Sequence, residues 1–220
     1  MIASFGQMVR FALFVNFVVL ALATITPSFA GQPVRIVAFG DSLTAGFGLA
    51  PQDAFPVRLE QLLKAKGHAV EIINAGVSGD TTAGGRGRLD WAVPPGTDAV
   101  ILELGANDML RAMPVDRARA NLDAILAKLN ERGIVVLLAG MRATRNLGDG
   151  YANSFDSIFA ELAEKHGALL YPFFLAGVAL DPKFNLQDGL HPNAAGVQII
   201  AERILPKVEE LLARVRAKRR

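Results

Sequence analysis

The chain has 220 residues, of which 51% are hydrophobic and 20% are charged, a composition typical of a globular protein about one domain in size. Disordered and fibrous classes are therefore excluded. The 23 basic and 21 acidic residues give a formal net charge of +2, and the basic excess lies mainly in the last seven residues. Because no basic stripe with interleaved aromatic residues is present, we expect no nucleic-acid partner and interpret the basic tail as a solvated helix end.

The first 30 residues predict export. Arg10 is the only charged residue among them, an apolar run follows it, and the small residues Ser28 and Ala30 occupy the two positions that determine cleavage. The pattern predicts a secretory signal peptide over residues 1–30 and a periplasmic or secreted bacterial protein, with no stable membrane span after cleavage. An uncleaved anchor is the alternative, because no charge occurs between Arg10 and Arg35.

Residues 31–220 predict a single domain in which short apolar segments alternate with longer amphipathic ones. This alternation is typical of α/β proteins with a parallel sheet. Five segments are rich in Val, Ile and Leu, as strands buried on both faces are; they are residues 34–39, 70–74, 99–104, 134–139 and 169–173. We therefore predict a three-layer α/β/α domain around a five-stranded parallel sheet.

Helical periodicity fills the intervals between these strands. The predicted helices cover residues 55–66, 82–91, 115–132, 152–166 and 193–215. Three of them stop at a glycine, namely Gly67, Gly133 and Gly167, where a left-handed cap can end a helix. In open parallel sheets, ligands bind outside the carboxyl ends of the strands, so the loops that follow the strands are the places to look for a site.

Three of these loops present a polar group at that edge. Ser42 follows the first strand and exposes a hydroxyl, although a serine at this point can also be an ordinary turn or cap residue. Gly79 follows the second strand and can present its N–H to a ligand, or simply permit a tight turn. Asn107 follows the third strand with a side-chain amide, which in a turn usually caps its own backbone.

A fourth loop, before the last helix, contains Asp188 and His191. A carboxylate at this spacing can reach the imidazole ring, fix its tautomer and stabilise the imidazolium form, although a turn aspartate beside an exposed histidine would show the same residues. The chain has no cysteine, no cluster with metal-ligand spacing and no phosphate loop. We expect neither a metal nor an organic cofactor.

Taken in order, Gly-Asp-Ser-Leu, the glycine at position 79, Gly-x-Asn-Asp and Asp-x-x-His resemble the four blocks of the SGNH (GDSL) hydrolase family over residues 33–212. The chain is most similar to its small bacterial secreted acyl thioesterases, arylesterases and lysophospholipases. The resemblance implies a flavodoxin-like fold with Ser42 as nucleophile, His191 as base and Asp188 as the group that orients the base. It also implies an oxyanion hole made of the N–H groups of Ser42 and Gly79 and the amide of Asn107.

The same resemblance implies a monomeric enzyme that cleaves small esters, thioesters or lysolipids through an acyl-enzyme. An O-acetyl polysaccharide esterase and a non-catalytic flavodoxin-like binding module are the alternatives. The loop over residues 140–148 departs from close relatives, which carry prolines and Asn-Tyr-Gly there, and this leaves the acyl-chain preference open. Seven apolar residues are candidates for an acyl groove: Leu110, Met113, Leu147, Phe173, Phe174, Phe184 and Leu186.

Overall fold

One five-stranded parallel sheet forms the centre of the molecule, and this confirms the predicted fold class. The structure, a computed structural model, describes residues 32–220, and the predicted signal peptide lies outside them. The sheet has the order β2-β1-β3-β4-β5. Its strands are β1 (Val34–Gly40), β2 (Val70–Gly76), β3 (Ala99–Glu103), β4 (Val135–Ala139) and β5 (Leu169–Tyr171).

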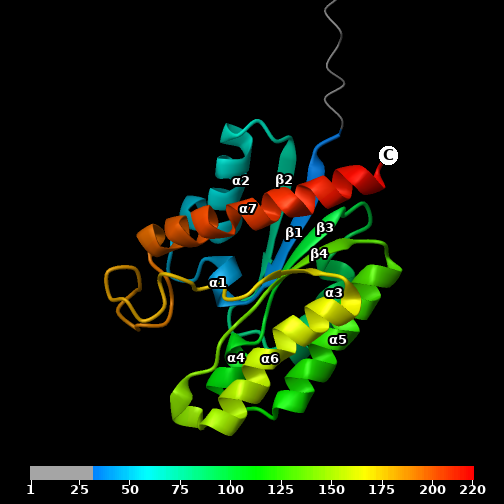
Figure 1. Ribbon diagram of the computed structural model, residues 1–220. Helices are drawn as coiled ribbons and strands as arrows, with labels where there is room; N and C mark the ends of the chain where they lie inside the picture. Colours follow the sequence, from blue (N-terminus) through cyan, green and yellow to red (C-terminus); the bar gives the residue numbers. More distant parts are fainter. Residues whose placement is uncertain (1–31) are drawn as a thin grey trace, which may run out of the picture.

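Helices cover both faces of this sheet, as Figure 1 shows. On one face lie α2 (Phe55–Ala65) and α7 (Ala194–Lys218), and on the other lie α3 (Thr82–Ala92), α5 (Val115–Glu131) and α6 (Asp149–His166). Strands β1, β3 and β4 are almost wholly buried because helices pack on both of their faces. Within residues 32–220, no helix combines the length and apolarity needed to cross a membrane.

The strand order reverses between β1 and β3, because the chain first moves from β1 outward to β2 and then crosses back to β3. Such a reversal leaves a crevice outside the carboxyl ends of the two central strands, where doubly wound folds bind their ligands. Ser42 follows β1 and Asn107 follows β3. The topology therefore places both residues at this crevice.

Several boundaries differ from the sequence prediction. The short helices α1 (Ser42–Ala45) and α4 (Ala106–Leu110) were not predicted as elements, because four or five residues are too few to show a helical period. Two single-turn helices, η1 (Pro51–Asp53) and η2 (Arg145–Leu147), were missed for the same reason. Strand β5 ends at Tyr171 instead of residue 173, since Pro172 has no N–H to donate to a sheet.

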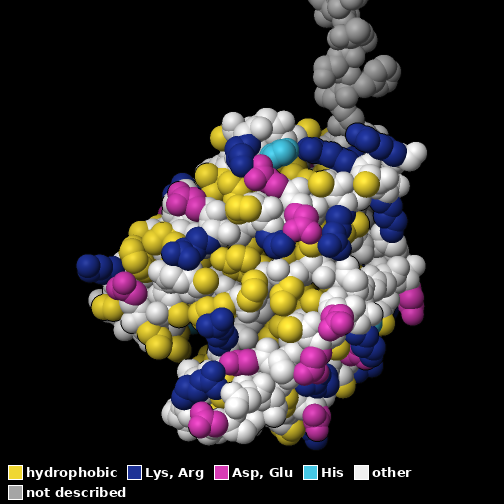
Figure 2. Space-filling view, in the orientation of Figure 1, with side chains coloured by type: hydrophobic (Ala, Val, Ile, Leu, Met, Phe, Trp, Pro, Cys, Tyr) yellow, Lys and Arg dark blue, Asp and Glu magenta, His cyan; other side chains and the backbone are white. Residues whose placement is uncertain are grey.

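The last predicted helix is longer than expected and its basic end makes specific contacts. Helix α7 continues to Lys218, beyond the predicted end at residue 215, and basic side chains gather at its C-terminal end in Figure 2. Arg219 pairs with Asp98 at 2.6 Å and donates to the carbonyl of Gln32 at 2.9 Å. The basic tail is thus an exposed helix end, as predicted, but Arg219 binds the segments that precede β1 and β3 and is not merely solvated.

Candidate active site

Ser42 lies at a tight turn between β1 and α1. Asp41 caps α1 by accepting the N–H of Leu43 at 3.0 Å, and Ser42 is the first residue of the helix. The turn requires glycine at position 40, because a Cβ there would lie only 2.1 Å from the hydroxyl oxygen of Thr44. The side chain of Ser42 is consequently held at the carboxyl edge of the sheet, where it lines a cavity.

The structure brings Ser42, His191 and Asp188 together, as the sequence analysis expected. The hydroxyl oxygen of Ser42 lies 2.9 Å from Nε2 of His191, and Nδ1 of His191 lies 2.7 Å from Oδ2 of Asp188. Although Ser42 and His191 are 149 positions apart in the chain, the fold joins them in one hydrogen-bonded series. This series has the geometry needed to move a proton from the serine hydroxyl to the imidazole ring.

Asp188 is held in its charged form by the backbone of its own loop. Its Oδ1 accepts the N–H groups of His191 at 3.0 Å and Leu190 at 2.9 Å. These two bonds, followed by the bond to the His191 ring, lower the pKa of Asp188 to about 2. The carboxylate is therefore ionised throughout the range in which a histidine titrates.

Further contacts hold His191 and its loop in place. The ring of Phe47 packs on it with 4.5 Å between centroids, and the His191 carbonyl accepts the N–H of Leu186 at 2.7 Å. An antiparallel bridge between Asn185 and Pro192 closes the same loop. These contacts hold the imidazole in its position beside Ser42.

The three groups expected to form the oxyanion hole lie in the segments after three neighbouring strands. Gly79 follows β2, Ser42 follows β1 and Asn107 follows β3. Within residues 32–220, neither the N–H of Ser42 nor that of Gly79 donates a hydrogen bond to a protein group. Gly79 has a φ of +83°, a left-handed conformation that favours glycine. Asn107 uses one amide hydrogen to bond Oδ2 of Asp41 at 3.1 Å, which leaves the second hydrogen for another acceptor.

Two acidic residues beneath this site, Asp41 and Glu103, were not predicted as part of it. Both side chains are fully buried. Oε2 of Glu103 accepts the hydroxyl of Thr44 at 2.8 Å and the N–H of Asp41 at 3.3 Å, whereas Oε1 has no partner within the described residues. A charged residue that ends the apolar segment Ala-Val-Ile-Leu-Glu is the sequence signal that could have revealed it.

Burial determines the protonation of this pair. Loss of solvation raises the pKa of Asp41 to about 6 and raises the pKa of Glu103 well above its ordinary value, with the nearby Asp41 carboxylate adding to the effect on Glu103. Two buried carboxyl groups this close do not both ionise readily. Near neutral pH, Asp41 is thus the charged member and Glu103 the neutral one.

Further buried polar contacts tie the loops of the site together. Arg88 of α3 pairs with Asp80 at 2.5 Å and donates to the carbonyl of Gly40 at 2.7 Å. Asp108 of α4 accepts both the N–H and the hydroxyl of Thr82, at 2.8 and 2.7 Å. These bonds fix the ends of β1, β2 and β3 relative to one another, so the groups at that edge are held in place by the scaffold.

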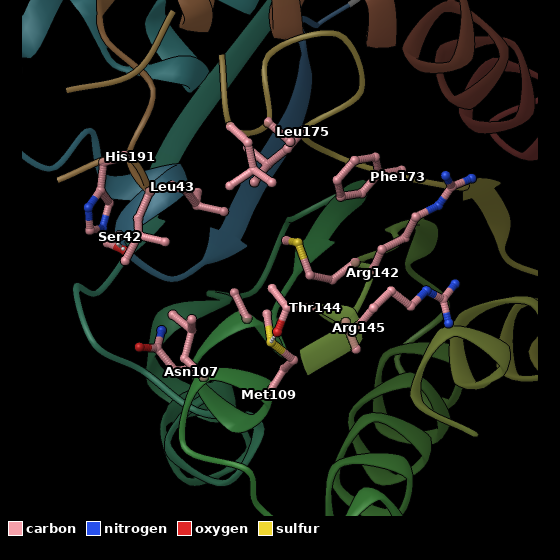
Figure 3. A pocket seen from close by; sticks show the side chains of 18 residues that line it. Ser42, Leu43, Asn107, Met109, Arg142, Thr144, Arg145, Phe173, Leu175 and His191 are labelled. Carbon is pink, nitrogen blue, oxygen red and sulfur yellow. Dashed lines mark hydrogen bonds between the residues drawn. The ribbon is translucent and has the colours of Figure 1, made fainter. Parts of the chain in front are cut away.

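A cavity of about 550 Å³ extends from Ser42 and His191 to Arg142 and Arg145, as Figure 3 shows. Its volume lies in the range of small-molecule sites. Most of its lining is apolar, including Leu43, Ala106, Met109, Leu110, Met141, Phe173, Leu175, Leu180 and Leu190. The cavity can therefore hold an acyl or aryl group whose carbonyl carbon lies beside the serine.

The predicted groove residues are only partly correct. Leu110 and Phe173 line the cavity. Phe174 does not, because it is fully buried in the core and packs edge-to-face on Phe55, with 4.9 Å between the ring centroids. Leu147 and Phe184 pack against the core as well, and Met113 and Leu186 are not part of the lining. Among residues 32–220, no group of three or more His, Cys, Asp and Glu side chains is placed to hold a metal ion.

A serine bonded to a histidine that is bonded to an aspartate, at the ligand-binding edge of a parallel sheet, is the arrangement found in serine hydrolases. Comparison with known proteins identifies the family within this class. Residues 38–199 match the GDSL-like Lipase/Acylhydrolase family. The chain belongs to this family, and it is an esterase of the GDSL type.

Similar proteins agree with this assignment. The crystal structure of AlinE4, described as an SGNH-hydrolase family esterase, is 45% identical, covers 83% of this chain and 98% of its own, and superposes with a TM-score of 0.70. An arylesterase of Vibrio mimicus is 36% identical over 76% of this chain and 84% of its own. Esterase TesA of Pseudomonas aeruginosa is 34% identical over 88% of this chain and 96% of its own.

Proposed function

We propose that the protein hydrolyses acyl or aryl esters and thioesters with Ser42 as nucleophile, His191 as general base and Asp188 as the group that orients the base. The observation that carries the proposal is the hydrogen-bonded series from the Ser42 hydroxyl to Nε2 of His191 at 2.9 Å and from Nδ1 to Asp188 at 2.7 Å. Because Asp188 stays ionised, it keeps the proton of the neutral ring on Nδ1 and leaves Nε2 free to accept one.

In this mechanism, His191 takes the hydroxyl proton as the Ser42 oxygen attacks the substrate carbonyl carbon. The negative charge that develops on the carbonyl oxygen is stabilised by the N–H groups of Ser42 and Gly79 and by the second amide hydrogen of Asn107. Nε2 of His191 then donates its proton to the departing alcohol or thiol. Water, deprotonated by His191, attacks the acyl-enzyme and releases the acid.

The apolar lining of the cavity supports acyl and aryl substrates over acetylated polysaccharides. A sugar ring presents hydroxyl groups that need hydrogen-bond partners, and burying them against leucine, methionine and phenylalanine side chains would be costly. The names of the similar proteins, arylesterase and esterase, point in the same direction. The non-catalytic binding module is set aside because the chain belongs to an esterase family.

A fluorophosphonate probe tests the nucleophile directly. We expect one covalent adduct on the peptide that contains Ser42 and none in Ser42→Ala, together with hydrolysis of p-nitrophenyl esters and acyl-coenzyme A thioesters by the unmodified enzyme. Ser78, the serine of the loop after β2, provides a matched control: Ser78→Ala should be labelled like the original protein. Labelling elsewhere, or hydrolysis that survives in Ser42→Ala, would contradict the assignment.

We also propose that residues 1–30 direct export and are removed after Ala30. The support is the sequence pattern of a single early arginine, an apolar run and small residues at the cleavage positions. Mass spectrometry of protein recovered from the periplasm or the medium of the native host should give an N-terminus at Gly31. A full-length species in the membrane fraction would favour the anchor instead.

A further inference from the structure

Two arginines lie at the end of the active-site cavity that is remote from the serine. Figure 3 shows Arg142 and Arg145 on the opposite side of the cavity from Ser42 and His191. Both arginines also line a second cavity of about 340 Å³, whose other lining residues include Asp156. They belong to the loop after β4, in which Arg145 is the first residue of the single-turn helix η2.

The two arginines differ in how their charges are compensated. Arg145 pairs with Asp156 at 3.3 Å and also donates to Asn153. Within residues 32–220, Arg142 makes no ion pair and no hydrogen bond, and its guanidinium lies 5.2 Å from the centre of the Phe173 ring. No aspartate or glutamate of the described residues lines the large cavity. The remote end of the apolar cavity therefore carries a positive charge without an acidic partner, on an exposed guanidinium that points away from Ser42.

Such a charge attracts an anion, and a guanidinium suits carboxylate and phosphate groups because its planar donors bind two oxygens at once. Stacking on Phe173 also restricts the guanidinium before a ligand arrives, which reduces the entropy lost on binding. The apolar residues between the serine and the arginines, among them Met109 and Leu175, would contact the part of the substrate that joins its two ends.

We propose that Arg142, with Arg145 beside it, binds a carboxylate or phosphate group that an apolar segment of the substrate separates from the scissile carbonyl. The proposal rests on the function proposed above and names its substrate class. The anion can be the far end of the acyl chain, as in a monoester of a dicarboxylic acid, or part of the leaving group, as in a phosphate-bearing thioester. Both sources present the same chemistry to the guanidinium.

The test compares matched substrates that share the p-nitrophenol leaving group. One series consists of p-nitrophenyl monoesters of unbranched dicarboxylic acids of graded length, and the other of p-nitrophenyl esters of monocarboxylic acids with the same carbon counts. We expect the ratio of kcat/KM, charged over neutral, to peak at one length and to fall about tenfold there in Arg142→Gln. Arg142→Lys should retain part of the ratio, and added salt should reduce it.

A second arm compares an acyl-coenzyme A with the same acyl group on an uncharged thiol, to locate an anion in the leaving group. Arg86→Gln is the control, because Arg86 is exposed on α3 and does not line the cavity; both ratios should stay unchanged in it. A fall in either ratio in Arg142→Gln supports the proposal and identifies the source of the anion. If both ratios are unchanged while the enzyme is active and Ser42 is labelled, the anion-binding proposal is overturned and the proposed function stands. If the protein shows neither hydrolysis nor labelling, the proposed function is overturned as well.

Discussion

Two aspartates flank the proposed catalytic residues Ser42 and His191, and their surroundings shift their pKa values in opposite directions. Asp188 lies in a loop with 37% of its side chain exposed, and three hydrogen bonds lower its pKa to about 2. Asp41 is fully buried beneath Ser42, and loss of solvation raises its pKa to about 6 despite bonds from Leu43 and Asn107. Hydrogen bonds alone favour the charged form, but complete burial outweighs them.

The comparison separates two tasks. In the proposed mechanism, the exposed Asp188 provides a permanent negative charge for the imidazole, which needs compensation whenever it carries a proton. The buried aspartate and its neighbour Glu103 instead hold backbone and side-chain donors in place, since their oxygens accept from α1, from Thr44 and from Asn107. Loss of the Asp188 carboxylate should mainly affect the rate of reaction. Changes in the buried pair Asp41 and Glu103 should affect the stability of the fold as well.

Ser42→Ala should have the largest effect on the rate, because the proposed roles of Asp188 and of the buried Asp41 both depend on the Ser42 hydroxyl. We expect kcat to fall by about four orders of magnitude or more, as it does when the nucleophile of a triad is removed. The alanine variant should keep its fold, since His191 is the only hydrogen-bond partner of the hydroxyl among residues 32–220. Steady-state kinetics and the thermal unfolding midpoint of the purified variant check both parts, and near-normal kcat would remove Ser42 from the mechanism.

Asp188→Asn should reduce kcat by about three to four orders of magnitude, because an asparagine can donate to Nδ1 and stabilise the wrong tautomer of His191. The free energy of unfolding near neutral pH should fall, because the asparagine lacks the stabilised charge, and the fall should be small because the carboxylate is substantially exposed. The lowered pKa means that the stabilising contribution of Asp188 is present above its ordinary pKa and is lost as the pH falls toward about 2.

Urea unfolding should therefore show that the original protein and Asp188→Asn converge in stability only in strong acid. The matched control is Asp181→Asn, an aspartate of the same region that accepts the N–H of Lys183 and has no contact with His191. It should leave kcat unchanged. An equal loss of activity in both variants would mean that Asp188 acts by shaping the loop.

Asn107→Ala should affect both the rate and the buried pair, because this side chain is proposed to donate to the oxyanion and is seen to donate to Asp41. We expect kcat to fall by about two to three orders of magnitude with a much smaller change in KM. Asp41 also loses a hydrogen bond that favours its charged form, so its pKa should rise further. Kinetics over a range of substrate concentrations distinguish this result from a change confined to KM, which would make Asn107 a substrate-binding residue.

Glu103→Gln should have the smallest effect on rate, because glutamine imitates the neutral acid and can accept the same two hydrogen bonds through its oxygen. The effect should appear in stability. Since burial raises the pKa of Glu103, the folded protein holds a proton that the unfolded chain releases. The free energy of unfolding therefore falls as the pH rises from the ordinary pKa of glutamate to the raised pKa. Glutamine does not titrate, so its advantage over glutamate should grow through this window.

Urea unfolding of Glu103→Gln and the original protein at several pH values measures this difference. Glu131→Gln, at the exposed end of α5, should show no such trend. If the difference in unfolding free energy between the original protein and Glu103→Gln does not depend on pH, Glu103 titrates normally and does not share its site with a charged Asp41.

The sequence predicted the five strands and the five longer helices to within a few residues, because buried strands and amphipathic helices carry strong periodic patterns. It also placed Ser42, Asp188 and His191 together, since family blocks and the strand-edge rule agree. Asp41 and Glu103 were missed because sequence reasoning does not show which acidic side chains turn inward. Phe174 was misplaced because the sequence does not show which of two successive aromatic residues in the loop after β5 faces the cavity and which packs in the core.

The ion pair between Arg219 and Asp98, together with the bond from Arg219 to the carbonyl of Gln32, places the two ends of the described chain side by side. Neighbouring termini are the condition under which a circularly permuted protein can fold. A short linker between residues 220 and 32, with new ends opened in an exposed loop far from the catalytic edge, would keep every strand in its place. The order in which the segments are synthesised would then change, while the distance between the serine hydroxyl and the imidazole would not.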